Sequence, residues 1–190
     1  MSKPLFDGKT LAGWVKSGFE GEGDVKVANP FREGRAAIVI EKGTTLSGIT
    51  STRRTELPRT NYELSFDAMR LGGLDFFCAL TFPVDRSACT LVVGGWGGSV
   101  VGLSSIDRQD ASQNETSQQM EFDDNRWYRI RVRVTGERIE AWIDDQKKID
   151  VSTQGRRIGM RPGEIEKSRP LGFATYMTRA AFREITLRRL

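Results

Sequence analysis

The sequence contains no histidine and only two cysteines, Cys78 and Cys89. The missing histidine excludes a Ser-His-Asp or Cys-His catalytic site within the chain, and it excludes a zinc site built on histidine. Two cysteines are too few for a zinc site made of thiolates alone. Acid–base chemistry must therefore use Asp, Glu, Lys, Tyr or Cys. We predict no cofactor, although the acidic loop 104–116 offers oxygen ligands that a hard divalent metal could use.

Long apolar runs are also missing. No segment approaches the roughly 18 consecutive apolar residues that a membrane helix needs, so we expect no membrane partner. The opening residues 1–4 do not lead into the apolar stretch of a signal peptide. This predicts a cytoplasmic protein, or a periplasmic or secreted one whose leader has been removed.

A dense charge of one sign is absent as well. The net charge is +4, and arginine doublets are scattered at positions 53–54, 156–157 and 188–189. Nucleic-acid-binding proteins usually gather basic residues into one patch. We therefore expect no nucleic-acid partner.

The chain is instead rich in short stretches where apolar and polar residues alternate, which is typical of β-strands. The predicted strands are 24–28, 36–41, 46–51, 62–70, 75–82, 89–95, 99–103, 127–135, 138–144, 171–177 and 181–190. Two longer loops, 104–116 and 153–169, interrupt the pattern. Many short strands at regular spacing predict a single all-β domain over residues 1–190, a sandwich or jelly roll.

The sequence of segment 127–144 predicts a β-hairpin and its strand register. A two-residue turn at Gly136-Glu137 places apolar residues of the two strands opposite one another on one face. The pairs on the other face are Arg133 with Glu140, Arg131 with Trp142, and Arg129 with Asp144. Opposite charges and a cation over an indole support this register.

A second hairpin turns near residue 85 and predicts the state of both cysteines. Its register places Cys78 opposite Val93 and Cys89 opposite Phe82, all on the core face. The cysteines then lie about 13 Å apart along the ladder, which is too far for a disulfide. We predict two buried free thiols.

The opposite face of this hairpin carries candidate binding residues. Asp75, Phe77 and Thr81 alternate onto it, and the second strand leads into Trp96 within the sequence GGWGG. Glycines on both sides remove neighbouring side chains, so a sugar could stack on the indole while carboxylates bind its hydroxyls. The alternative is an indole packed under a loop, with the glycines serving a β-bulge.

Three segments resemble the 3-keto-disaccharide hydrolase family. Residues 5–14, LFDGKTLAGW, are similar to its LFDGKxLxGW opening, and residues 61–67 resemble its nFELxFE strand. Residues 127–145 and the FREI sequence at 182–185 resemble its later hairpin and its FRNI ending. The resemblance implies a concanavalin A-like or laminin G-like jelly roll of two curved antiparallel sheets. It also implies a carbohydrate partner and action on 3-keto-glucosides by elimination and hydration at C1–C2.

The strand alternation and the family resemblance together predict a candidate site. Where the family has an NSGIxxR strand, this chain has LDFFCALT, and Asp75 stands near the position of the family's asparagine. We predict that Asp75 and Asp107 are catalytic, because the loop with Asp107 follows directly after the Trp96 segment. We predict that the substrate is bound by Trp96, Phe77, Thr81, Arg53 and Arg54.

Three functions stay open from the sequence. The first is an enzyme acting on keto-glycosides. The second is a glycan-binding module without catalysis, and the third is a laminin G-like domain that binds proteins. Glu140 and Asp144 flank Trp142 as glycosidase acids do, but both already have arginines across the strand, so we expect them to be structural.

Overall fold

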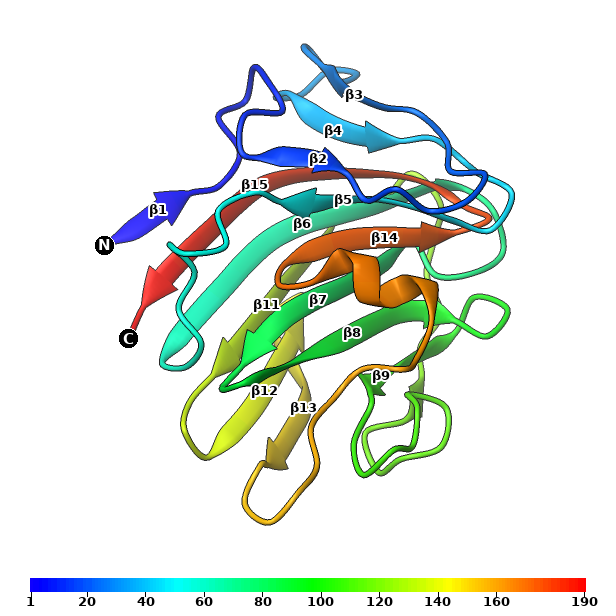
Figure 1. Ribbon diagram of the computed structural model, residues 1–190. Helices are drawn as coiled ribbons and strands as arrows, with labels where there is room; N and C mark the ends of the chain where they lie inside the picture. The colour runs from blue at the N-terminus through cyan, green and yellow to red at the C-terminus, as the bar shows by residue number, and fades with distance from the viewer.

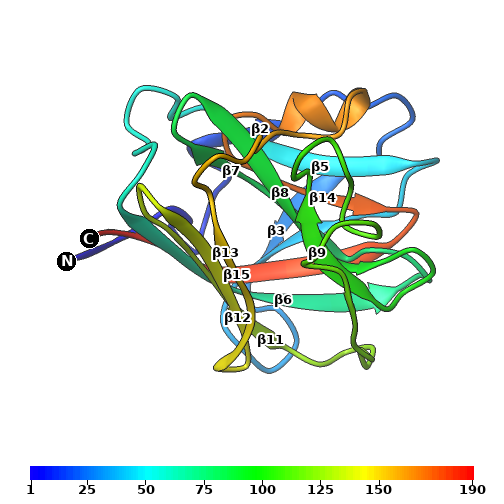
Figure 2. The ribbon, with the colours of Figure 1, turned by 90° about the horizontal axis from the view of Figure 1, so that it is seen from below.

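Two antiparallel sheets pack face to face in the computed structural model, which describes residues 1–190 (Figures 1 and 2). In spatial order, sheet A consists of β13 (Gln146–Ser152), β12 (Arg138–Ile143), β11 (Tyr128–Val134), β6 (Tyr62–Gly72), β15 (Arg179–Arg189), β4 (Ala37–Ile40) and β3 (Val25–Ala28), with β1 (Ser2–Pro4) pairing β15. Sheet B consists of β10 (Gln118–Gln119), β9 (Val100–Ser104), β8 (Ser87–Gly95), β7 (Cys78–Val84), β14 (Gly172–Tyr176), β5 (Leu46–Ser51) and β2 (Trp14–Lys16). A short 3₁₀ helix, η1 (Glu164–Ser168), lies outside sheet B (Figure 2).

This architecture confirms the predicted all-β jelly roll of two antiparallel sheets. Each predicted strand has a counterpart, with ends shifted by a few residues. The sequence did not reveal β1, β2, β10 and β13. The first three have two or three residues each, too few to show an alternation, and β13 buries only Ile149 and Val151. The structure contains no helix long and apolar enough to span a membrane.

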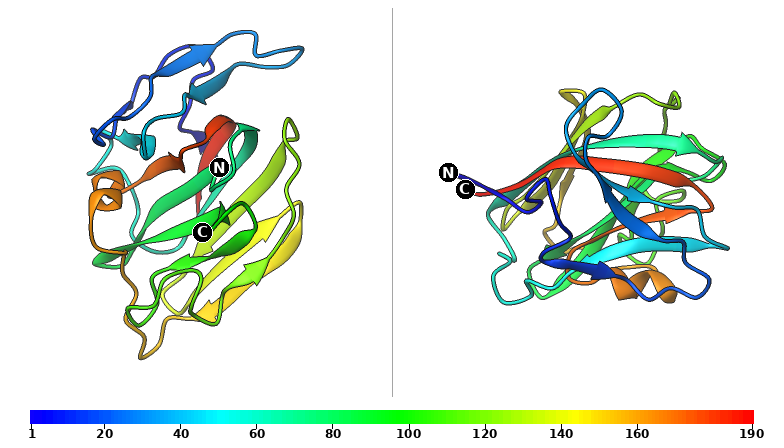
Figure 3. Two further views of the ribbon diagram at one scale, coloured as in Figure 1. Left: turned by 90° about the vertical axis from the view of Figure 1, so that its right-hand side faces the viewer. Right: turned by 90° about the horizontal axis from the view of Figure 1, so that it is seen from above.

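The chain termini lie side by side at one end of the molecule (Figure 3). The cause is the pairing of β1 with the end of β15, which sets Ser2 opposite Arg188. The first strand of the chain is therefore paired directly with the last one in sheet A.

The core between the sheets is aromatic at its centre. Phe173 of sheet B faces Phe66 and Phe182 of sheet A, with ring centroids at 4.9 and 4.8 Å, and Trp14 lies 5.6 Å away. All four side chains are buried. Alternating residues of both sheets supply the rest of the core, as expected for a sandwich.

The hairpin of β11 and β12 has the predicted register, and the Arg131 guanidinium lies 3.9 Å from the centre of the Trp142 ring. The predicted partners of the charges are partly wrong. Arg133 pairs with Glu63 of β6 at 3.0 Å, and Glu140 pairs with Lys147 of β13 at 2.6 Å. The reason is that β11 and β12 each have a second neighbouring strand that the hairpin alone does not include.

The hairpin of β7 and β8 also has the predicted register, and both cysteines are buried and free, as predicted. Burial raises the pKa of the Cys89 thiol to about 12 and raises that of Cys78 as well. Both thiols are therefore protonated and inaccessible at neutral pH.

We expect a thiol reagent such as dithionitrobenzoate to leave the native protein unlabelled over an hour at pH 8. In denaturant both cysteines should react at once, because unfolding exposes them and restores ordinary acidity. The measurement is absorbance of the released thiolate. Rapid labelling of the native protein would contradict the burial of β7 and β8.

Sheet B has an outer face built of small residues and covered at two places. Phe19 and Ile165 pack over Ala79 and Ala174, forming a small apolar cluster on this face. The segment of η1 lies directly on β14, since a Cβ on Gly172 would lie 2.8 Å from the Ser168 carbonyl oxygen. The uncovered part of this face holds the candidate site.

Candidate functional site

A pocket of about 320 Å³ opens on the outer face of sheet B, between η1 and the turn that carries Trp96. Its floor consists of short side chains on the central strands: Ala79 of β7, Thr90 and Val92 of β8, and Ser104 of β9. Because these side chains are short, the sheet itself is accessible from outside. The volume lies at the lower end of the range for small-ligand sites, about 300–1,000 Å³.

The rim of the pocket combines aromatic and charged side chains. Phe76 and Tyr176 form one side, with ring centroids 5.8 Å apart, and Trp96 stands beside them. Asp75 lies at the same end, and Arg161 and Glu164 come from the segment before η1 and from η1 itself. Few polar groups in a mostly apolar concavity are the usual composition of a ligand site.

Trp96 is held at the rim by a turn of unusual backbone geometry. Its φ is +48°, in the left-handed region, and Gly97 and Gly98 follow at +87° and +117°. Glycine adopts such angles without strain, so the sequence allows a turn that leaves the indole 42% exposed. The exposed indole that the sequence suggested is therefore present, and the alternative of a ring packed under a loop is wrong.

Asp75 is tied to this turn by its carboxylate. One oxygen, Oδ1, accepts a hydrogen bond from the Phe76 amide at 2.7 Å, and Oδ2 accepts one from the Gly97 amide at 3.3 Å. The carboxylate makes no salt bridge within the chain. Asp75 thus keeps free acceptor capacity at the pocket, which suits a general base or an acceptor for hydroxyl groups.

Glu164 and Arg161 are the charged pocket residues that sequence reasoning missed. The Lys167 ammonium hydrogen-bonds the Glu164 carboxylate at 3.0 Å and holds the pKa of that carboxyl below its usual value. Arg161 forms no salt bridge. Both lie in the region 153–169, which the sequence predicted as a loop. Nothing in that sequence indicated which face of which sheet the loop covers.

Comparison with known proteins identifies the family. A family model of the 3-keto-alpha-glucoside-1,2-lyase-like domain matches residues 1–188. The chain belongs to this family. The resemblance predicted from residues 5–14, 61–67 and 127–145 is thereby confirmed. No curated protein matches this chain significantly in sequence.

Several solved structures share the fold of this chain. The carbohydrate binding module CBM66 from Bacillus subtilis is 16% identical, with a TM-score of 0.57 over 93% of this chain and 95% of that one. Domain 4 of AbnA, a GH43 extracellular arabinanase from Geobacillus stearothermophilus, solved with arabinotriose, is 14% identical, with a TM-score of 0.57 over 93% and 82%. A glycosyl hydrolase family protein from Mycobacterium fortuitum is 10% identical, with a TM-score of 0.54 over 99% and 98%. At sequence identities this low, the structural similarity shows a common fold and no more.

Phe77 does not line the pocket, so this prediction is wrong. It is fully buried between the sheets and packs against Phe122 and Tyr128, with ring centroids 5.2 and 6.0 Å away. The regular strand begins only at Cys78, so strand alternation does not extend back to residue 77. Phe76 takes the pocket side instead.

Thr81 lies on the predicted face, opposite Thr90, but does not line the pocket. It is fully buried, and its hydroxyl shares a hydrogen bond of 2.9 Å with that of Thr90 on the neighbouring strand. Thr90 is the member of this pair that reaches the floor. Thr81 can therefore orient the Thr90 hydroxyl, but it does not reach a ligand.

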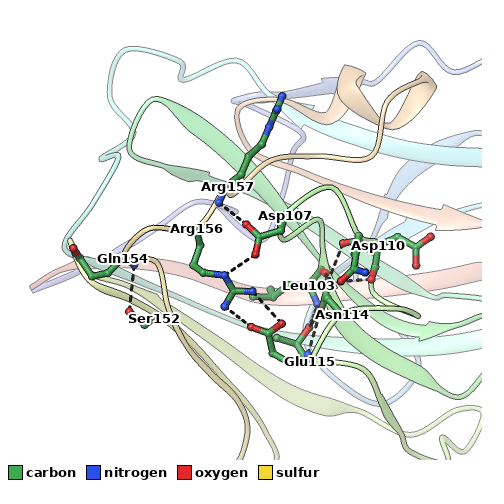
Figure 4. Close-up of polar contacts among 11 residues, drawn as sticks. Leu103, Asp107, Asp110, Asn114, Glu115, Ser152, Gln154, Arg156 and Arg157 are labelled. Carbon is green, nitrogen blue, oxygen red and sulfur yellow. Dashed lines mark hydrogen bonds and ion pairs between the residues drawn. The ribbon is translucent and has the colours of Figure 1, made fainter.

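Asp107 is absent from the pocket lining, contrary to the prediction that it joins Asp75. Its carboxylate accepts hydrogen bonds from the Arg157 amide at 2.8 Å and from the Arg156 guanidinium at 2.7 Å (Figure 4). The Arg157 amide is the larger cause, and with Arg156 it holds the pKa of Asp107 below its usual value. Glu115 binds the other side of the same guanidinium. Asp107 therefore fastens the loop 104–116 to residues 156–157.

Arg53 and Arg54 also lie outside the pocket. The Arg53 guanidinium donates to the carbonyl oxygens of Leu5 and Ala12, at 3.2 and 3.0 Å, and lies against Gly13. Arg54 is exposed and makes no side-chain contact with a charged partner. Arg53 thus bridges two parts of the N-terminal segment. The arginine doublet alone does not reveal this structural role.

The opening motif that identified the family is likewise structural. Asp7 accepts hydrogen bonds from the Thr10 hydroxyl and from the amides of Thr10 and Lys9, which lower its pKa to about 2. The Trp14 indole donates to the Leu5 carbonyl oxygen at 2.8 Å. These bonds shape the turn that leads into β2, and they lie outside the pocket.

Glu140 and Asp144 belong to sheet A and its edge, away from the pocket on sheet B. They pair with Lys147 at 2.6 Å and Arg126 at 2.7 Å. Their expected structural role is consistent with these partners. Nowhere do three or more carboxylate or thiol side chains gather as they would around a metal ion.

Proposed function

We propose that the pocket binds a glycoside ring against the Trp96 indole and that the protein cleaves 3-keto-glucosides there by 1,2-elimination. The observation that carries this proposal is the meeting of a half-exposed indole and an unpaired carboxylate, Asp75, above a floor of short side chains. The family to which the chain belongs, named for 3-keto-alpha-glucoside-1,2-lyases, supports the reaction type.

Binding follows from the composition of the pocket. A pyranose presents an apolar C–H face that can lie on an indole, and its hydroxyls need hydrogen-bond partners at the ring edge. Asp75 accepts such bonds, Arg161 donates them, and the Thr90 and Ser104 hydroxyls of the floor can do both. The short floor residues leave room for the ring to approach the sheet.

The elimination needs one base near C2 of the sugar. A ketone at C3 acidifies the C2–H bond, and the Asp75 carboxylate takes that proton. The electron pair of the C2–H bond then forms the C1–C2 double bond while the C1–O bond breaks. The departing oxygen takes a proton from water, which releases the alcohol and an unsaturated keto sugar. The Arg161 guanidinium can stabilise negative charge that develops on the C3 oxygen.

A glycan-binding module without catalysis is the second candidate, and the state of Glu164 favours it. Lys167 lowers the pKa of the Glu164 carboxyl, so this carboxyl is poorly suited to protonate a leaving group. The shared fold with CBM66 and with the arabinanase domain solved with arabinotriose agrees with such a role.

One experiment separates these functions. The purified protein is mixed with a 3-keto-glucoside, turnover is followed by release of the alcohol, and saccharide binding is measured in parallel by calorimetry. Turnover supports the lyase, and binding without turnover supports the module. If neither occurs and a protein partner co-purifies, both carbohydrate functions are refuted and a laminin G-like role is favoured.

We expect Trp96→Ala to weaken saccharide binding at least about tenfold, or 1.4 kcal/mol, because the indole is the largest apolar surface that the pocket offers a ring. Calorimetric titration checks this result. Trp142→Ala is the matched control, because Trp142 stacks under Arg131 on sheet A, away from the pocket. An unchanged affinity in Trp96→Ala would refute the proposal that the saccharide ring stacks on this indole.

A further inference from the structure

A second, more polar pocket of about 580 Å³ adjoins the first. The two share Arg161 and Pro162 in their lining, so this part of the chain borders both pockets. Residues of the loop 105–110 and of the segment 157–169 line the second pocket, together with Ser87. Its lining differs sharply from that of the first pocket, because only two of its twelve residues are hydrophobic.

The second pocket gathers four arginines without partners. They are Arg108, Arg157, Arg161 and Arg169. None of these guanidinium groups takes part in a salt bridge or a side-chain hydrogen bond within the chain, although eleven other arginines do form salt bridges. Unpaired cations that share one concavity repel each other and raise the local concentration of anions.

The two carboxylates in this pocket do not neutralise the arginines. Asp110 accepts hydrogen bonds from the amide and hydroxyl of Ser112, and Glu166 lies near the Gly163 amide at 3.5 Å. Four guanidinium groups against two carboxylates leave a formal charge of +2. The pocket therefore has both unused donors and an excess of positive charge.

The backbone explains why one arginine of the doublet 156–157 is free. Residues 157–159 pair with 105–107: the Ser105 amide donates to the Gly159 carbonyl at 2.7 Å, and the Asp107 amide donates to that of Arg157 at 2.8 Å. Successive side chains of such an extended segment point in opposite directions. Arg156 turns to Asp107 and Glu115, whereas the Arg157 side chain extends away from them (Figure 4).

We propose that this arginine pocket binds the anionic substituent of a saccharide whose ring occupies the pocket beside Trp96. The proposal rests on the proposed function and narrows its substrate class to acidic saccharides. The substituent is a phosphate, sulfate or carboxylate group, because the planar fork of a guanidinium matches their oxygens with two parallel hydrogen bonds. Arg161, which lines both pockets, lies where ring and substituent would meet.

The test uses three matched ligands: methyl α-glucoside, its 6-phosphate and methyl α-glucuronide. By calorimetry at fixed ionic strength, at least one anionic ligand should bind the wild type at least tenfold more tightly than the neutral glucoside. The double variant Arg157→Ala/Arg169→Ala should lose this gain and retain the affinity for the neutral ligand. Arg54→Ala is the control, because Arg54 is exposed and lines neither pocket. The gain should also shrink as salt is raised.

The outcomes distinguish this proposal from the proposed function. Equal affinity of the wild type for all three ligands refutes the anion site and leaves saccharide binding intact. The same holds if the double variant, folded by its circular dichroism, keeps the gain. If the neutral glucoside does not bind but inorganic phosphate still binds through Arg157 and Arg169, the saccharide function fails and the anion site stands.

Discussion

Replacing Asp75 with asparagine is expected to lower the turnover of a 3-keto-glucoside by about 100- to 10,000-fold, the usual contribution of a general base. The amide of asparagine is not basic enough to take the C2 proton. Its oxygen can still accept one of the two backbone hydrogen bonds that Asp75 accepts, from the Phe76 and Gly97 amides. The turn with Trp96 should therefore persist. The affinity for a saccharide should fall far less than turnover does, because the asparagine oxygen can still accept a hydrogen bond from a sugar hydroxyl.

Steady-state kinetics of the wild type and the variant measure this effect, and calorimetry measures binding. Asp145→Asn is a matched control, since Asp145 is exposed in the turn between β12 and β13 and its φ of +63° suits asparagine. Unchanged turnover in Asp75→Asn would refute the role of Asp75 as base. A loss of affinity as large as the loss of turnover would show that Asp75 acts by holding the ligand and not as a base.

Phe173→Ala is expected to lower the free energy of unfolding by about 3–5 kcal/mol, the usual cost of emptying a buried aromatic site. Phe173 is 1% exposed and touches the rings of Trp14, Phe66 and Phe182. It is the ring of sheet B that fills the space between the two sheets at their centre. The surrounding strands are hydrogen-bonded on both sides, so the cavity can close only partly.

Urea denaturation followed by tryptophan fluorescence measures the loss. Phe173→Leu should cost clearly less, because leucine fills most of the same volume. Phe76→Ala should also cost less, because Phe76 is only half-buried at the pocket rim. A loss below about 1 kcal/mol in Phe173→Ala would mean that the two sheets do not depend on this aromatic contact.

The opposite faces of β7, β8 and β14 explain how one sheet supports both stability and a site. The inner face carries large side chains such as Leu80 and Phe173, and the outer face carries Ala79 and Ala174. A strand gives alternate residues to opposite faces, so these two compositions coexist in the same few residues. The pocket exists because the outer residues are short, and it is rigid because the inner ones are packed.

The sequence by itself determined the local pairings. The registers of the β7–β8 and β11–β12 hairpins follow from short turns and from the requirement that apolar residues share a face, and both are present in the structure. The separation and burial of the two thiols follow from the same register. The glycines around Trp96 allowed two interpretations, an exposed indole or one packed under a loop, and the structure decided for the exposed indole.

Only the tertiary structure decided which distant segments meet. Glu63, for example, binds Arg131 and Arg133 of β11 and Arg188 of β15, partners that depend on the order of strands in sheet A. Arg161 and Glu164 reach the pocket because residues 153–169 cross the outer face of sheet B. An irregular segment has no periodicity that would record which surface it covers. Its path is fixed by contacts with strands far away in the sequence, and no pattern within residues 153–169 encodes those contacts.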